Sequence, residues 1–369
     1  MKRSIVQMIM ILTLIGATLL SSCSSSGSST TGADATPQNP IDDDSEATGN
    51  IYTVASSDIS TEVTDAVNTT LELAKTEWGL DWNLDYYIVG DNKAEAQALL
   101  EDTYCARGVQ QDRYTSLDQC LQFNPKEPVD DGSGTARHVG LMEYYEYGTN
   151  PGGSAARAGL APMHVFFHSI PRGLVNKDDP GGNPAPSSDE DLATVLHEFW
   201  HAVQVETTGE TSEGAVQPLM GPVWFVEGAA EYMGQSMRAK LRADGTLPEI
   251  GNSTQPFSFQ DKMSSASSAI DQEVAPCSST TLTEITGYDH ACADYGMTLG
   301  TWAIPYLLSL DGVSSDAITK TLNPAVAANG WQQAFEATAG MTLSEFETSF
   351  HAWLDSTNLA ERLQILPTF

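Results

Sequence analysis

The sequence predicts an α+β fold in which an N-terminal mixed sheet and one long helix precede a mostly helical C-terminal part. Short runs rich in Tyr, Ile and Val alternate with helical spacing between about residues 51 and 187, and helical patterns dominate after that. Of the 369 residues, 41% are hydrophobic, which is enough for a substantial core. We therefore expect an α+β subdomain over residues 51–205 and a helical subdomain over residues 206–369.

The first 22 residues have the pattern of a signal peptide. Lys2 and Arg3 precede an uncharged apolar stretch, which ends at Leu20-Ser21-Ser22-Cys23. This ending resembles a bacterial lipobox, which implies cleavage before Cys23 and lipidation of its sulfur. By the same resemblance, Ser24 implies export to the outer membrane, so the mature chain is expected in the bacterial cell envelope on a lipid anchor. A plain signal peptide or a single membrane-spanning anchor is the alternative.

Residues 23–50 start with the lipidated cysteine and continue as a Ser/Asp-rich segment that is too polar to fold, so we expect a disordered tether. The whole chain has 17 Lys and Arg against 49 Asp and Glu, which gives a net charge of −32. This balance argues against nucleic acid as a partner, because phosphate binding requires a basic surface. Solubility outside the cytoplasm is the favoured explanation of the acidity, and a cation-binding acidic face is the alternative.

Four cysteines follow Cys23, namely Cys105, Cys120, Cys277 and Cys292. An even number of cysteines in an exported chain favours two disulfides over four buried free thiols. The two pairs of sequence neighbours are each 15 positions apart. Among the three connectivities that four cysteines allow, we therefore predict Cys105–Cys120 and Cys277–Cys292.

The N-terminal subdomain begins with helical spacing over residues 60–78. We expect a second helix over residues 94–100, and strands over residues 84–89, 139–147 and 163–170. The Asp/Gly/Pro loops at 130–134 and 176–186 belong to a type that sometimes binds Ca²⁺. Because they lack the ligand spacing of a calcium site, ordinary turns are favoured and Ca²⁺ is only a weak candidate.

The segment that begins at Ser187 contains the motif that points to chemistry. Ser187 and Glu190 fit a capping box, so a helix should begin here, and Gly209 is a suitable end. Inside this helix lies His197-Glu198-Phe199-Trp200-His201. The two histidines are four positions apart, so both imidazoles project from one face and can hold one Zn²⁺ ion. Glu198 points at a different angle and can take a proton from a water molecule polarised by the zinc.

A catalytic zinc site needs a third protein ligand and one open position. Positions 204 and 207 hold Gln and Thr, which excludes the metzincin continuation of the motif. Further along, residues 224–232 are Trp-Phe-Val-Glu-Gly-Ala-Ala-Glu-Tyr. This segment after His-Glu-x-x-His resembles the gluzincin metallopeptidases, and most closely the bacterial collagenase-type and peptidase MA-like catalytic domains. The resemblance implies a zincin-like fold with Glu227 as the third zinc ligand.

Neighbours of Glu227 extend the predicted site. Glu231 follows one turn later and can accept a hydrogen bond from the second nitrogen of a ligand histidine. Gly228 and the two alanines after it are small enough to let this helix approach the zinc helix closely.

The resemblance also implies two features that lie outside the motif. One is a downstream tyrosine or histidine that stabilises the oxyanion of the reaction. We assign this role to Tyr295, with His290 and Tyr288 as alternatives. The other is an edge strand just before the zinc helix that pairs with the extended substrate, for which residues 163–169 are the candidate.

Together these patterns predict a lipid-anchored zinc metallopeptidase that cleaves a peptide or protein substrate. His197, His201 and Glu227 would hold one Zn²⁺ per chain, and Glu198 would activate water. The alternatives are a non-catalytic zinc-binding cell-envelope lipoprotein on a peptidase scaffold and a zinc hydrolase of non-peptide bonds. The presence of Glu198 favours an enzyme. The substrate itself is not predicted, because specificity depends on loops whose placement the sequence does not give.

Overall fold

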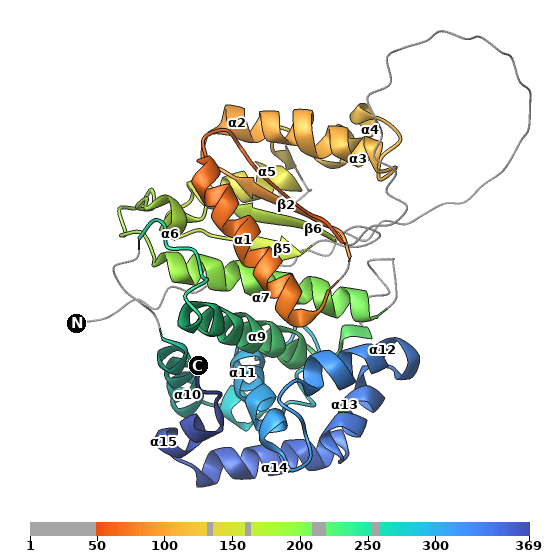
Figure 1. Cartoon of the computed structure of the whole chain (residues 1–369), viewed down its shortest axis with the longest axis vertical. Coiled ribbons are helices and arrows are strands. Elements are labelled where there is room, and N and C mark those ends of the chain that lie inside the picture. The colour runs from red at the N-terminus through yellow and green to blue at the C-terminus, as the bar shows by residue number, and fades with distance from the viewer. Residues whose placement is uncertain (1–48, 81, 131–135, 159–163, 209–218, 253–257) are drawn as a thin grey trace, which may run out of the picture.

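A computed structural model of the chain describes residues 49–80, 82–130, 136–158, 164–208, 219–252 and 258–369. A sheet-containing half and a helical half meet where α7 (Ser188–Thr207) lies beside α9 (Val223–Ala243) (Figure 1). The predicted signal peptide, Cys23, nearly all of the tether and Gly209 lie outside the described residues. Among the helices that are described, none is both long and apolar enough to cross a membrane.

The main sheet has four strands in the order β1-β2-β6-β5. Strands β1 (Ile51–Ala55), β2 (Leu84–Val89) and β6 (His164–Ser169) are parallel, whereas β5 (Ala156–Ala158) runs antiparallel to β6. The sheet is therefore mixed, and the general α+β prediction is confirmed. The predictions for β2 and β6 agree with the structure, while β1 and β5 are strands that the sequence patterns did not predict. The short β3 (Val129–Asp130) and β4 (Ala136–Arg137) form a separate hairpin.

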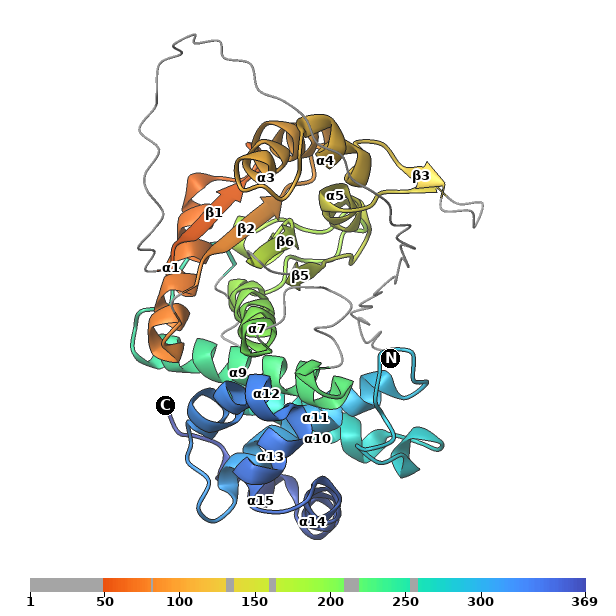
Figure 2. The ribbon, with the colours of Figure 1, turned by 90° about the vertical axis from the view of Figure 1, so that its right-hand side faces the viewer.

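Helices cover both faces of the main sheet (Figure 2). Alternate residues of β2 point to opposite faces of the sheet, and apolar side chains are buried on both. Tyr86 and Ile88 lie in the core that includes α1 (Thr61–Trp78) and α7, whereas Tyr87 and Val89 lie in the core on the other face. The second face is covered by α2 (Lys93–Ala98), a π-helical stretch (Leu99–Cys105), α3 (Ala106–Gln110), α4 (Leu117–Phe123) and α5 (Leu141–Thr149). The short α6 (Arg172–Val175) links β6 to the segment before α7.

The strand predicted over residues 139–147 is wrong, because this segment forms most of helix α5. Its buried residues Leu141, Met142, Tyr144 and Gly148 recur with helical spacing. The three tyrosines of the segment have high strand propensity, but that propensity yields to packing against the sheet. Gly140, at a φ of 62°, turns the chain into the helix.

Strand β6 is not the edge strand that the resemblance implied for residues 163–169. It pairs with β2 on one side and with β5 on the other, so its backbone groups are engaged within the sheet. The edge on this side is β5, which also packs against α7. The error arose because β5 has only three residues and is too short for a sequence pattern.

The helical half continues from α9 with α10 (Phe259–Gln272), α11 (Ala293–Ser309), α12 (Asn323–Asn329), α13 (Trp331–Ala339), α14 (Leu343–Ser356) and α15 (Leu359–Arg362). One apolar core runs through both halves of the molecule. It includes Ile88 of β2, Leu196 of α7, Ala229 of α9, Leu299 of α11 and Phe346 of α14. The helix that contains the histidine motif therefore lies in the middle of the core, where its side chains are held on both sides.

The structure contains both predicted disulfides. Cys105–Cys120 joins the π-helical stretch to α4 on the far face of the sheet. Cys277–Cys292 closes the connection between α10 and α11 in the helical half. Cys277–Cys292 therefore fixes a segment that has little regular structure of its own, whereas Cys105–Cys120 ties short helices together.

Candidate metal centre

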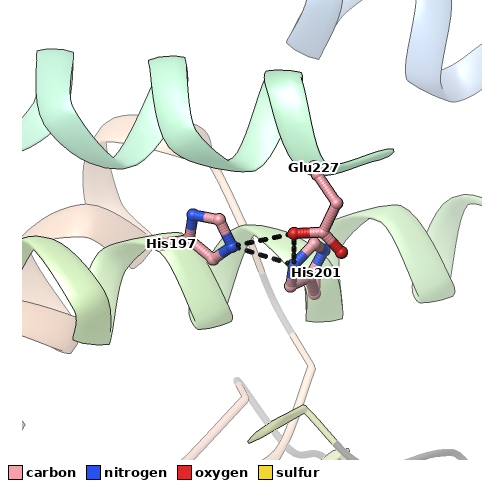
Figure 3. A group of neighbouring side chains, drawn as sticks. All are labelled: His197, His201 and Glu227. Carbon is pink, nitrogen blue, oxygen red and sulfur yellow. Dashed lines mark hydrogen bonds and ion pairs between the residues drawn. The ribbon is translucent and has the colours of Figure 1, made fainter. Parts of the chain in front are cut away.

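Helix α7 begins at the capping box that the sequence predicts. The Ser187 side chain accepts a hydrogen bond from the backbone of Asp189, and the Glu190 carboxylate accepts one from the backbone N–H of Ser187. These contacts give hydrogen-bond partners to backbone N–H groups that have none within the helix, and they fix where the helix starts. His197 and His201 then fall one turn apart on the side of α7 that faces α9 (Figure 3).

Helix α9 approaches α7 closely through Gly234. A Cβ atom at position 234 would lie only 2.8 Å from the backbone nitrogen of His197, so no larger residue fits without a backbone shift. Gly228, which was expected to serve this purpose, instead faces α11, where an added Cβ would lie 2.5 Å from the Cα of Gly300. Gly234 thus lets α9 pack tightly against α7, and Gly228 lets it pack tightly against α11. These two contacts fix the position of α9 and therefore of Glu227.

Three side-chain atoms converge between α7 and α9. The Nε2 atoms of His197 and His201 are 3.1 Å apart. Oε2 of Glu227 lies 3.3 Å from the first and 3.5 Å from the second of these nitrogens (Figure 3). His201 and Glu227 are buried, and the His197 side chain is 15% exposed, so the group lies just below the surface. These three residues form a group that could hold a metal ion.

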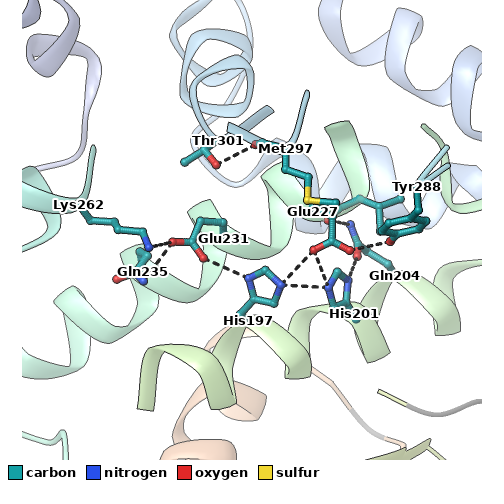
Figure 4. Close-up of polar contacts among 11 residues, drawn as sticks. His197, His201, Gln204, Glu227, Glu231, Gln235, Lys262, Tyr288, Met297 and Thr301 are labelled. Atoms are coloured by element: carbon teal, nitrogen blue, oxygen red, sulfur yellow. Dashed lines mark hydrogen bonds and ion pairs between the residues drawn. The ribbon is translucent and has the colours of Figure 1, made fainter. Parts of the chain in front are cut away.

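The remaining nitrogen of each imidazole is engaged away from the centre (Figure 4). Nδ1 of His197 lies 3.2 Å from Oε2 of Glu231, at the position expected for this residue. Nδ1 of His201 lies 2.8 Å from Oε1 of Gln204. The Gln204 amide nitrogen donates to the carbonyl of Val226, so its oxygen is left to accept from His201. When both Nδ1 atoms carry hydrogen for these contacts, both Nε2 atoms can offer a lone pair to a cation at the centre.

The charges around the centre favour a cation there. Burial lowers the pKa of His197, but hydrogen bonds to Glu227 and Glu231 outweigh it and raise the pKa to about 10. Burial opposes ionisation of Glu227 as well, yet the two histidines hold its pKa well below the usual range. Lys262, 2.6 Å from Glu231, helps to lower the pKa of that carboxyl against the effect of burial. A field that favours a proton on an imidazole also favours a metal cation between the same atoms.

The residues present fit a zinc ion. Two imidazoles and one carboxylate form the donor set of several catalytic zinc sites. Tetrahedral bonds of about 2.0–2.2 Å place neighbouring ligand atoms about 3.3 Å apart. The three observed separations, from 3.1 to 3.5 Å, centre on this value. Three lone-pair donors this close would repel one another, so a cation or a proton must lie among them.

Glu198 is on the same helix and is 1% exposed. Its charge raises the pKa of both histidines and of Tyr288, although in each case burial has a larger effect. Its carboxylate is therefore close enough to the centre to act on it electrostatically. It is not one of the three converging ligands.

The tyrosine beside the centre is Tyr288, not Tyr295. The Tyr288 hydroxyl donates to Oε1 of Glu227 at 2.6 Å (Figure 4). Tyr295 lies in the first turn of α11, and the charges that act on it come from Glu273, Asp355 and Asp271, after the effect of burial. His290 accepts a hydrogen bond from the backbone of Cys292 and so stabilises a local turn. Of the three sequence candidates, Tyr288 is therefore the one that the geometry favours over Tyr295 for a role beside the ligands.

Two residues near the centre were not predicted. Gln204 lies three positions after His201, and this helical spacing was a usable signal for a side chain that orients the imidazole. Lys262 comes from α10 and had no sequence signal. The weak calcium candidate in the loop at 176–186 has an ordinary explanation, since Asp178 and Asp179 accept hydrogen bonds from backbone N–H groups of their own turn. Most of the loop at 130–134 lies outside the described residues.

The geometry of the centre therefore rests on helices from both halves of the fold. Helix α7 supplies His197 and His201, α9 supplies Glu227 and Glu231, and the loop before α11 supplies Tyr288. Comparison with models of known protein families, with curated proteins and with solved structures finds no match to this chain.

Proposed function

We propose that this chain is a zinc-dependent metallopeptidase. The observation that carries the proposal is the convergence of His197 Nε2, His201 Nε2 and Glu227 Oε2 within 3.5 Å of one another, with both Nδ1 atoms bonded elsewhere. Zn²⁺ bound by such residues supplies Lewis-acid chemistry that polarises a carbonyl group and a water molecule. The gluzincin-like segment over residues 224–232 supports the peptide bond as the target.

Glu198 is the proton carrier in this proposal. Its carboxylate takes a proton from the attacking water as the new bond forms between oxygen and the peptide carbon. It then delivers that proton to the amine nitrogen as the C–N bond breaks. Burial of Glu198 supports this role, because a carboxylate shielded from bulk water can pass its proton to the reacting groups rather than to solvent.

Tyr288 is the proposed donor to the oxyanion. Its hydroxyl lies against Oε1 of Glu227, the oxygen that is not among the three converging atoms. Burial and the charge of Glu227 both raise the pKa of Tyr288, so the hydroxyl keeps its proton and remains a donor. A donor at the edge of the ligand group can stabilise negative charge that develops on the substrate oxygen.

Tyr288→Phe should lower kcat about 10²-fold with little change in KM, because it removes one donor to the developing charge. The measurement is steady-state peptide hydrolysis at saturating zinc, so that a modest loss of metal affinity does not contribute. Tyr295→Phe is the matched control on the same stretch of chain and should stay close to wild type. Equal losses in the two variants would contradict the role of Tyr288.

The short strand β5 is the proposed site of substrate backbone binding. It forms one edge of the sheet, packs against α7, and among the described strands pairs only with β6. An extended peptide that added to this edge would lie alongside the helix of the metal ligands. The proposal therefore favours substrates that are unfolded or have extended segments.

Location in the cell envelope is part of the same proposal. It rests on the sequence of residues 1–50, where an apolar leader ends at Cys23 and a polar tether follows. A tether of this length would let the folded part act on substrates at some distance from the membrane surface.

The proposal is tested by incubating the purified, zinc-loaded chain with a diverse peptide library and mapping new peptide ends by mass spectrometry. We expect cleavage that stops when a chelator removes the metal and returns when Zn²⁺ is restored. No cleavage by a chain that holds one zinc would contradict the peptidase proposal and favour a zinc-binding envelope lipoprotein without catalytic activity. Cleavage that persists without metal would contradict the role of the centre.

A further inference from the structure

Tyr288 reaches the metal centre on a loop that a disulfide closes. This loop, residues 277–292, connects α10 to α11 and is here called the Tyr288 loop. Cys277 and Cys292 are its first and last residues, and they are joined. Between them the chain forms turns and one short 3₁₀ helix, Cys277–Ser279, so regular secondary structure does little to fix the position of Tyr288.

The disulfide and Tyr288 belong to the same small apolar cluster. Cys292, Ile285 and Val223 are its buried members, and Cys277 and Tyr288 pack against them. Val223 is the first residue of α9, one turn before Glu227. The disulfide thus lies against the helix that carries a ligand, in contact with the cluster that supports the tyrosine.

The first half of the Tyr288 loop is held by contacts of its own. Glu347 of α14 accepts hydrogen bonds from both the backbone N–H and the hydroxyl of Thr283, at 3.1 and 2.8 Å. Leu282 is buried in the main core. These contacts hold the first half of the loop. The half that contains Tyr288 ends at Cys292, which the disulfide ties to Cys277, and it also has local hydrogen bonds at His290. Opening the disulfide should therefore affect Tyr288 more than the loop as a whole.

We propose that the Cys277–Cys292 disulfide is a positioning element of the metal centre, which holds the Tyr288 hydroxyl against Glu227. Its loss releases Tyr288 while His197, His201 and Glu227 keep their places, because those residues are fixed by α7 and α9. The consequence for turnover rests on the proposed peptidase function, whereas the release of Tyr288 does not. Under reducing conditions the chain would keep its metal and lose most of its activity.

The second disulfide provides a matched control. Cys105–Cys120 spans the same 15 positions, but its cluster lies on the opposite face of the sheet with Leu100 and Tyr104. Both of its cysteines are fully buried, whereas Cys277 is partly exposed. Mild reduction of the folded chain should therefore open Cys277–Cys292 first.

The experiment compares the double variants Cys277→Ser/Cys292→Ser and Cys105→Ser/Cys120→Ser with the full wild-type chain. Three quantities are measured: zinc per chain, kcat and KM for peptide hydrolysis, and nitration of Tyr288 by tetranitromethane, mapped by mass spectrometry. In the first variant we expect unchanged zinc, a 10- to 100-fold lower kcat from the misplaced donor, and several-fold faster nitration of Tyr288. The control variant should match wild type in all three.

Unchanged nitration of Tyr288 in the first variant would overturn the proposal whether or not the chain hydrolyses peptides. Faster nitration with no hydrolysis by wild type would support the positioning role and reject the peptidase function instead. Loss of zinc together with faster nitration would also overturn it, because the disulfide would then support the whole centre. If the double variant does not fold, wild-type chain reduced under native conditions, with the alkylated cysteines mapped, gives the same three readouts.

Discussion

Glu198→Gln should abolish most peptide hydrolysis while zinc remains bound. Glutamine has nearly the same shape as glutamate but cannot accept the proton of the attacking water, and general acid–base catalysis contributes about 10²–10⁴-fold. The ligand atoms of His197, His201 and Glu227 are unchanged, so the metal content should stay at one per chain. Hydrolysis is followed on peptides from the library, and zinc is measured in the same samples.

Glu206→Gln is the matched control for this variant. Glu206 lies on the same helix, but it is half-exposed and pairs with His164, away from the converging ligands. It should therefore leave kcat unchanged. Hydrolysis by Glu198→Gln within a few-fold of wild type would exclude Glu198 as the proton carrier. Loss of zinc in Glu198→Gln would show instead that this carboxylate helps to hold the metal.

The parts of the centre that depend on local rules were predictable from the sequence. The capping box at Ser187 and Glu190 depends on side chains three positions apart, and the motif from His197 to His201 depends on the helical repeat. Glu227 and Glu231 follow the same repeat on α9. The pairing of the four cysteines could also be predicted, because the two members of each pair are close in sequence.

Features that depend on long-range packing were not predictable in the same way. Tyr288 and Glu227 are 61 positions apart, and only the folded loop reveals that Tyr288 and not Tyr295 meets the carboxylate. The strand predicted at 139–147 forms α5, because burial on the sheet outweighs the strand propensity of tyrosine. Likewise, the close contact with α7 is made at Gly234, whereas Gly228 contacts α11. The sequence does not show which side of α9 faces which helix.

Glu227→Ala should deprive the chain of its metal under conditions in which wild type retains it. Structural zinc sites with four ligands have apparent binding free energies of about 10–16 kcal/mol, which corresponds to about 2.5–4 kcal/mol per ligand. Removal of one ligand should therefore weaken zinc binding by about two to three orders of magnitude. Alanine is preferred to glutamine here, because a glutamine oxygen at the same place could still bind the metal. The measurement is zinc per chain after dialysis against a series of buffered free zinc concentrations.

Glu231→Gln tests whether Glu231 is itself a metal ligand or only orients the ligand His197. Oε2 of Glu231 contacts Nδ1 of His197, so its replacement leaves three ligands in place and should weaken binding by only about 10- to 100-fold. Because zinc binds the folded state, the midpoint of thermal unfolding should rise with added zinc in wild type, and less so in Glu227→Ala. Equal zinc affinity in wild type and Glu227→Ala would reject Glu227 as a ligand, and the convergence of the three atoms would then reflect a protonated histidine pair.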